Sequence, residues 1–178
     1  AHFYCVASGR ANPTYGLSKA TKTMQTIQNA INGAKVTSAS KRQSPVFNPA
    51  TGEQTGVLPL STVEEVNAAV AAAKAAAPAW GATPPMKRVR SMFKFKELLE
   101  KNADAIARAI SNEHGKTHAD ALGELSRGID VVDFACGIPH QLKGEYSRNV
   151  GPEIDSWSDR QPLGVVAAVV PWNSQLFL

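Results

Sequence analysis

The residue best placed to do chemistry is Asn173, which lies near the carboxyl end of the 178-residue chain. It follows a valine-rich apolar run, residues 163–170, and then Pro171 and Trp172. A carboxamide at the mouth of a buried strand can donate an N–H hydrogen bond to an oxygen that becomes anionic during acyl transfer, and loss of one such donor typically lowers the rate by about 10²–10³. An asparagine that caps a turn or a helix is the alternative, and the position alone leaves both open.

Arg127 and Cys136 are the other reactive side chains that stand in informative surroundings. Arg127 lies in an otherwise apolar helical pattern, where a guanidinium could hold a substrate carboxylate through two parallel hydrogen bonds. The alternative for Arg127 is a salt bridge, or a side chain that extends to solvent. Cys136 has apolar neighbours and no base nearby in sequence, so we expect its thiol to stay protonated and to pack in the core.

Composition excludes several classes of protein and site. The two cysteines, Cys5 and Cys136, form neither a disulfide framework nor a metal-ligand spacing, so we expect no metal and a reducing, cytoplasmic location. The net charge of +4 comes from scattered Lys and Arg, which argues against a nucleic-acid partner. The longest apolar stretch, residues 163–171, is about half of what a membrane-spanning helix needs, so no membrane is expected.

The first 23 residues differ from the rest of the chain. They are rich in Ser, Thr and Ala and contain no acidic residue. A mitochondrial transit peptide would share this composition, which would place the protein in the mitochondrial matrix, but an Arg-rich amphipathic pattern is missing. We therefore favour a disordered or foreign leader over residues 1–23, with the real protein beginning at Met24.

The elements that must position these side chains form an α/β pattern. Residues 163–170 lack polar alternation, which is typical of a strand buried on both faces of a parallel sheet, where ligands collect beyond the carboxyl ends of the strands. Asn32-Gly33 predicts a hairpin within residues 27–36, and residues 54–60 read as a further strand. A capping box of Ser61 and Glu64 predicts the start of a helix.

Further helices follow along the chain. Pro84-Pro85 opens the second helical stretch, which breaks near Asn102 and stops at Gly115. A third helix is expected from about Thr117 to residue 137. Residues 154–160 read as an extended arm, in which Ile154, Ser156 and Ser158 alternate with Asp155, Trp157 and Asp159.

At these residues the chain resembles the aldehyde dehydrogenase superfamily. The matching segments are residues 47–53 (FNPATGE), 113–117 (EHGKT), 162–166 (PLGVV) and 171–173 (PWN). Within the superfamily it is most similar to the CoA-acylating methylmalonate-semialdehyde (malonate-semialdehyde) dehydrogenases. That narrower likeness rests on residues 123–128 (GELSRG), 134–140 (FACGIPH), 142–146 (LKGEY) and 154–158 (IDSWS).

The resemblance implies an activity and roles for four residues. Such enzymes oxidise an aldehyde through a cysteine hemithioacetal, reduce NAD, and in the acylating branch transfer the acyl group to coenzyme A after decarboxylation. Asn173 matches the side-chain donor of the oxyanion hole. Val170 and Trp172 match positions whose backbone lies along NAD, and Arg127 matches an arginine that holds the substrate carboxylate.

We therefore expect residues 24–178 to be the amino-terminal part of an aldehyde dehydrogenase fold. It would comprise helices, the first strand of a Rossmann-like NAD-binding domain, and extended segments of an oligomerisation arm. The expected products are propionyl-CoA or acetyl-CoA, and the full-length enzyme is expected to be a homodimer or homotetramer. The nucleophilic Cys of the family matches no residue here, so the chain alone is expected to be inactive. The alternatives are a non-acylating aldehyde dehydrogenase fragment and a helical interaction module without activity.

Overall fold

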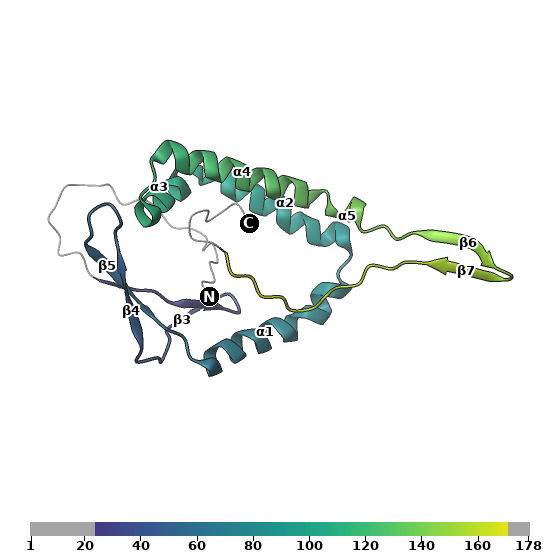
Figure 1. Cartoon of the computed structure of the whole chain (residues 1–178), viewed down its shortest axis with the longest axis horizontal. Helices are drawn as coiled ribbons and strands as arrows, with labels where there is room; N and C mark the ends of the chain where they lie inside the picture. The colour runs from purple at the N-terminus through teal and green to yellow at the C-terminus, as the bar shows by residue number, and fades with distance from the viewer. Residues whose placement is uncertain (1–23, 171–178) are drawn as a thin grey trace. The chain divides into compact units, whose positions relative to one another are not determined.

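The computed structural model describes residues 24–170 of the chain (Figure 1). These residues fall into two compact units. The first comprises residues 24–75 together with Asn112–Gly115, and the second comprises Ala76–Ser111 and the described residues from Lys116 onward.

Short strands make up most of the first unit. One sheet has the order β1-β5-β4, in which β1 is parallel to β5 and β4 is antiparallel to it, while β2 and β3 form a separate antiparallel hairpin. The turn residues Asn32 and Gly33 have φ angles of 51° and 75°, the left-handed geometry of a tight hairpin turn, so the predicted hairpin is confirmed. The strands are β1 (Gln25–Thr26), β2 (Asn29–Ile31), β3 (Ala34–Val36), β4 (Gln43–Phe47) and β5 (Gln54–Pro59).

Helix α1 (Val63–Ala82) begins one residue later than the sequence suggested. The cap is formed by Thr62 and Glu65: the Glu65 N–H donates to Thr62 Oγ1 at 3.3 Å, and the Thr62 N–H donates to Glu65 Oε2 at 2.9 Å. The expected capping box of Ser61 and Glu64 was therefore wrong in register. Ser61 instead accepts a hydrogen bond from Asn29 Nδ2 at 2.9 Å, which ties the start of the helix to β2.

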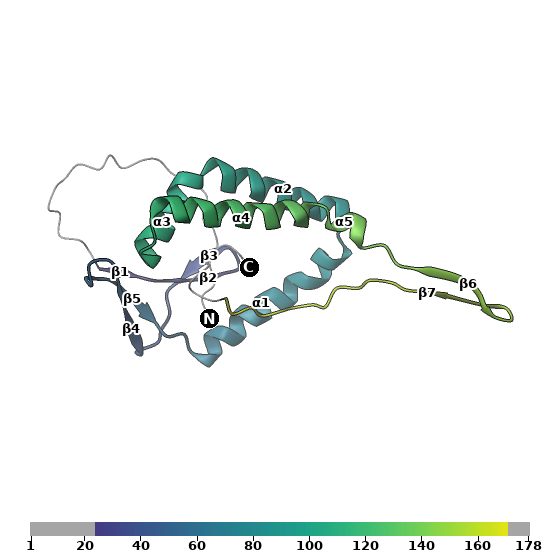
Figure 2. The same cartoon turned by 45° about the horizontal axis from the view of Figure 1, so that its top comes forward.

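The helices that follow α1 end close to where the sequence predicted. Asn102 caps the end of α2, Gly115 has a φ of 86°, and Thr117 caps α4 by accepting from the Asp120 N–H. Helices α2 and α4 lie side by side in both views (Figures 1 and 2), and a small core of Ala107, Ile110 and Ala121 joins α3 to α4. The helices are α2 (Pro85–Lys101), α3 (Ala103–His114), α4 (His118–Cys136) and α5 (Ile138–Gln141).

A two-stranded arm follows α5 and extends away from the helices of the second unit (Figure 2). It consists of β6 (Tyr146–Gly151) and β7 (Ile154–Trp157), paired antiparallel, which confirms an extended arm in this region. The two segments that lead into and out of the arm approach closely at its base, where the Ser158 N–H donates to the Glu145 carbonyl at 2.9 Å. Gly144 is required at this close approach, because a Cβ atom there would overlap the carbonyl oxygen of Ser158.

The structure contradicts the predicted buried strand at residues 163–170. Over these residues it assigns no strand, and Leu163 and Val169 are 94% and 87% exposed. A strand buried on both faces needs hydrogen-bonded neighbours and covering helices. Because no strand within residues 24–170 pairs with this segment, the apolar pattern is present but the sheet that it would join is not.

Candidate functional site

Helix α4 carries Arg127, the candidate carboxylate-binding residue that lies within the described part of the chain. The helix turns one face inward, and Arg127 lies outside that face and is exposed. The expectation that Arg127 belongs to an apolar face was therefore wrong: the apolar spacing runs through Leu125 and Gly128 on either side of it. The buried residues of α4 are Ala121, Glu124, Leu125, Gly128 and Cys136.

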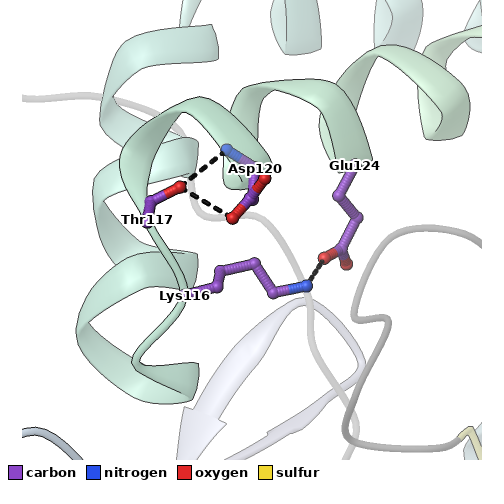
Figure 3. Close-up of polar contacts among 4 residues, drawn as sticks. All are labelled: Lys116, Thr117, Asp120 and Glu124. Atoms are coloured by element: carbon purple, nitrogen blue, oxygen red, sulfur yellow. Dashed lines mark hydrogen bonds and ion pairs between the residues drawn. The ribbon is translucent and has the colours of Figure 1, made fainter.

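A buried ion pair holds the first half of α4. Glu124 is 1% exposed, and its Oε2 accepts a hydrogen bond from Lys116 Nζ, which comes from the loop that precedes the helix (Figure 3). The Lys116 side chain is itself only 17% exposed. A carboxylate in the core is costly unless it is paired, so this contact fixes the loop against the helix.

Polar contacts at the amino end of α4 reinforce that arrangement. The Asp120 N–H donates to Thr117 Oγ1 at 3.2 Å, and Thr117 Oγ1 donates to Asp120 Oδ2 at 2.7 Å (Figure 3). His118 Nε2 lies 3.1 Å from Asp104 Oδ1 on α3. The Arg108 guanidinium first, and His118 second, lower the pKa of the Asp104 carboxyl, so this carboxyl stays ionised at neutral pH.

Glu124 lies three residues before Arg127, so both belong to adjacent turns of one helix. The guanidinium also packs near the same turn, since a Cβ atom at Gly123 would lie 3.9 Å from an Arg127 terminal nitrogen. The ion pair therefore positions the backbone that presents Arg127. The Lys116–Glu124 ion pair was not predicted from the sequence. The available signal was Glu124 itself, an ionisable residue that shares a helix face with Ala121, Leu125 and Gly128.

The remaining candidate residues lie at the carboxyl end. Val170 is 45% exposed and lies in no strand of the described sheets. Trp172 and Asn173 lie outside the described residues. The structure thus describes Arg127 and Val170, on separate elements, and the assembled site stays a prediction.

Other groups are arranged as follows. Cys136 is 7% exposed, which confirms that it packs in the core. Within residues 24–170, no three His, Cys, Asp or Glu side chains gather as metal ligands would. Among the helices described, none combines the length and the apolar character needed to cross a bilayer.

Comparison with known proteins identifies the family. The sequence model of the aldehyde dehydrogenase family matches residues 35–178. Malonate-semialdehyde dehydrogenase of Pseudomonas aeruginosa is 53% identical over 150 residues, which are 84% of this chain and 30% of the relative. The mitochondrial, acylating methylmalonate-semialdehyde dehydrogenase of Arabidopsis thaliana is 46% identical over 147 residues, 83% of this chain and 24% of the relative.

Solved structures agree with these relatives. The crystal structure of methylmalonate-semialdehyde dehydrogenase from Oceanimonas doudoroffii is 55% identical, with a TM-score of 0.83 over 86% of this chain and 31% of the other. A protein of Sinorhizobium meliloti 1021, assigned as a methylmalonate-semialdehyde dehydrogenase and complexed with NAD, is 43% identical, with a TM-score of 0.84 over 88% of this chain and 32% of the other. The chain spans about a third of the length of these proteins. Its elements and motifs are those of their amino-terminal part, and the chain belongs to the aldehyde dehydrogenase family.

Proposed function

We propose that this chain is the amino-terminal part of an NAD-dependent, CoA-acylating dehydrogenase of methylmalonate or malonate semialdehyde. The observation that carries the proposal is the 53% identity over 150 residues to a malonate-semialdehyde dehydrogenase. The aligned part is 84% of this chain, and the segments of α4 and the arm region that resemble this group support the narrower assignment. The products would be propionyl-CoA or acetyl-CoA, CO₂ and NADH.

The proposed roles follow from the chemistry of each side chain. Asn173 donates an N–H to the substrate oxygen as it becomes anionic, and Arg127 binds the carboxylate that a semialdehyde of this class carries. The exposure of Arg127 suits contact with a ligand. The backbone at Val170 and Trp172 lies along NAD. NAD supplies the hydride acceptor, and coenzyme A supplies the thiol that leaves with the acyl group.

The 178-residue chain is proposed to be silent by itself. Its cysteines are Cys5 and Cys136, and Cys136 is buried in a helical core. Incubation with NAD, coenzyme A and malonate semialdehyde should give no NADH. Steady turnover by this chain would refute the proposal, as would selective labelling of Cys136 by an aldehyde-like electrophile at neutral pH.

A chimaera tests the proposed activity directly. Residues 24–178 of this chain would replace the matching amino-terminal segment of the P. aeruginosa relative. We expect the chimaera to reduce NAD in the presence of malonate semialdehyde and to release acetyl-CoA. We expect this turnover to depend on coenzyme A. Turnover without any dependence on coenzyme A would favour the non-acylating alternative. A folded chimaera without turnover would favour the helical interaction module.

Two substitutions in the chimaera separate the proposed roles. Asn173→Ala should lower kcat by about 10²–10³, because the oxyanion loses one donor. Arg127→Gln should raise KM for malonate semialdehyde more than it lowers kcat, while a neutral aldehyde without a carboxylate should be affected little. Arg90→Gln is the matched control, since Arg90 is also an exposed helical arginine. Equal effects at Arg127 and Arg90 would remove the proposed role of Arg127.

We also propose that the full-length protein is a cytoplasmic homodimer or homotetramer that uses the arm. Exposed apolar side chains on both strands support association: Tyr146, Ile154 and Trp157 are 62%, 56% and 72% exposed. Trp157→Ser in the chimaera should shift light-scattering mass toward the monomer. An unchanged mass would show that the arm is not the contact.

A further inference from the structure

The second unit contains a cavity that neither Arg127 nor Val170 lines. Its volume is about 600 Å³, and it lies where the end of α1, the start of α2, α5 and residues 159–162 come together. Apolar side chains dominate its wall, among them Trp80, Met92, Ile138 and Leu142. Cavities of this size, mostly apolar with a few polar groups, are typical of small-molecule sites.

The polar groups of the wall carry an excess of positive charge. They include two arginines, Arg88 and Arg160, against one carboxylate, Asp159. Arg160 Nε is directed to the Lys143 carbonyl at 3.4 Å, and Asp159 accepts from Gln161 at 3.3 Å. Arg88 is half-buried, and its Nε is fully buried with no hydrogen-bond partner among the described residues.

Because this Nε is closed off from solvent, a ligand in the cavity would meet the rest of the guanidinium of Arg88. The start of α2 lies at the same cavity, with Pro84 and Pro85 in its wall and no side-chain cap. The amino end of a 17-residue helix adds a positive potential there. The Arg88 guanidinium in the wall and the helix dipole thus favour the same kind of ligand, an anion.

We propose that this cavity binds a small monocarboxylate with an aromatic or branched apolar body. The carboxylate accepts hydrogen bonds from the Arg88 guanidinium at the start of α2, and the apolar body lies against Trp80 and Met92. Arg88 then acts as a ligand-binding residue. The site does not depend on the proposed dehydrogenase activity, and Arg127 and Val170 take no part in it.

Calorimetric titration of the chimaera, in which the carboxyl-terminal part covers the exposed apolar faces, tests the proposal, with para-nitrobenzoate as the probe and para-nitrobenzamide as its neutral analogue. We expect saturable one-to-one binding of the carboxylate and at least tenfold weaker binding of the amide, because the amide loses the charge-assisted hydrogen bonds. Arg88→Gln should weaken carboxylate binding at least tenfold. Arg90→Gln on the same helix is the matched control and should leave it within about twofold.

Ala135→Leu provides a second test that keeps the charge. Ala135 lines the cavity, so the larger leucine side chain should fill part of it and weaken the binding of carboxylate and amide alike. Circular dichroism of each variant shows that the helices persist. The proposal is overturned by equal affinity for para-nitrobenzoate and para-nitrobenzamide, by equal effects of Arg88→Gln and Arg90→Gln, or by the absence of saturable binding.

Discussion

At the scale of single residues, the contact with the largest energetic consequence is the Lys116–Glu124 ion pair. Glu124 is buried at 1% exposure, and the Lys116 side chain is 17% exposed. Removal of one partner from a buried pair leaves an uncompensated charge, whereas replacement of both by apolar groups is often neutral. The main effect of the pair is therefore to fix the position of the loop before α4 against the helix, and its net contribution to stability is smaller.

We expect Lys116→Met to lower the free energy of unfolding by up to about 3–5 kcal/mol, because the buried Glu124 carboxylate loses its ammonium partner. The double variant Lys116→Met, Glu124→Leu should recover most of that loss. Urea unfolding followed by circular dichroism measures both. Lys94→Met is the control, since the Lys94–Glu97 pair is 60% exposed on each side and should contribute far less to stability. Equal losses at Lys94 and Lys116 would contradict this account.

A second residue-scale prediction concerns the start of α1. Thr62 accepts from the Glu65 N–H and caps the helix, whereas Ser61 contacts Asn29 at the surface. Thr62→Ala should therefore cost about 1 kcal/mol of stability. Ser61→Ala should cost less than half of that, as judged by thermal unfolding. A larger loss of stability for Ser61→Ala than for Thr62→Ala would instead support Ser61 as the helix cap, as the sequence suggested.

At the scale of elements, local signals predicted well and non-local ones did not. The hairpin turn at Asn32-Gly33, the stop at Gly115 and the cap at Thr117 each depend on a few adjacent residues, and each is confirmed. The segment 163–170 depends on strands distant in sequence, so its composition could not show whether they are present. The capping box missed by one residue because Ser61 and Thr62 are chemically equivalent caps.

The arm should be most stable between two pH limits. Tyr146 OH donates to Asp155 Oδ2, and the Asn149 N–H donates to Asp155 Oδ1 at 3.0 Å. The Tyr146 hydroxyl first, and the Asn149 N–H second, lower the pKa of Asp155. The stabilisation by the Asp155 carboxylate is therefore complete above its usual pKa of about 4, and it is lost as the pH falls through the lower pKa of the folded protein. The carboxylate raises the pKa of Tyr146, so its contribution is present below ~10 and lost as pH rises through the folded value.

The amide resonance of Asn149 reports this window in NMR titrations of the chimaera with ¹⁵N-labelled asparagine. We expect its shift to be constant near neutral pH and to change at both the acidic and the alkaline limit. Asp155→Asn should abolish the acidic step. An acidic step that persists in Asp155→Asn would show that another carboxyl is responsible.

At the scale of the whole chain, large apolar side chains remain uncovered in each unit. Val63 on α1, Phe134 on α4 and Leu163 are 70%, 66% and 94% exposed. Such surfaces are typical of interfaces or of aggregation-prone faces. The matched relatives are about three times as long as this chain, so the surfaces suit burial by their remaining segments.

We therefore expect the isolated chain to bind a hydrophobic dye such as anilinonaphthalene sulfonate and to associate as its concentration rises. The chimaera should bind much less dye per amino-terminal segment, because the carboxyl-terminal part covers these faces. Equal dye binding by chain and chimaera would contradict this, as would sharp, well-dispersed amide NMR resonances from the chain alone.

The close approach at Gly144 determines where the arm can accept insertions. Its base has no room even for a methyl group beside Ser158, so added residues there would force the two strands apart. The tip differs, because the turn between β6 and β7 is exposed and Glu153 already adopts a φ of 60°. An epitope tag or a fluorophore attachment site is thus best introduced at residues 152–153, where it lengthens the turn and leaves the base unchanged.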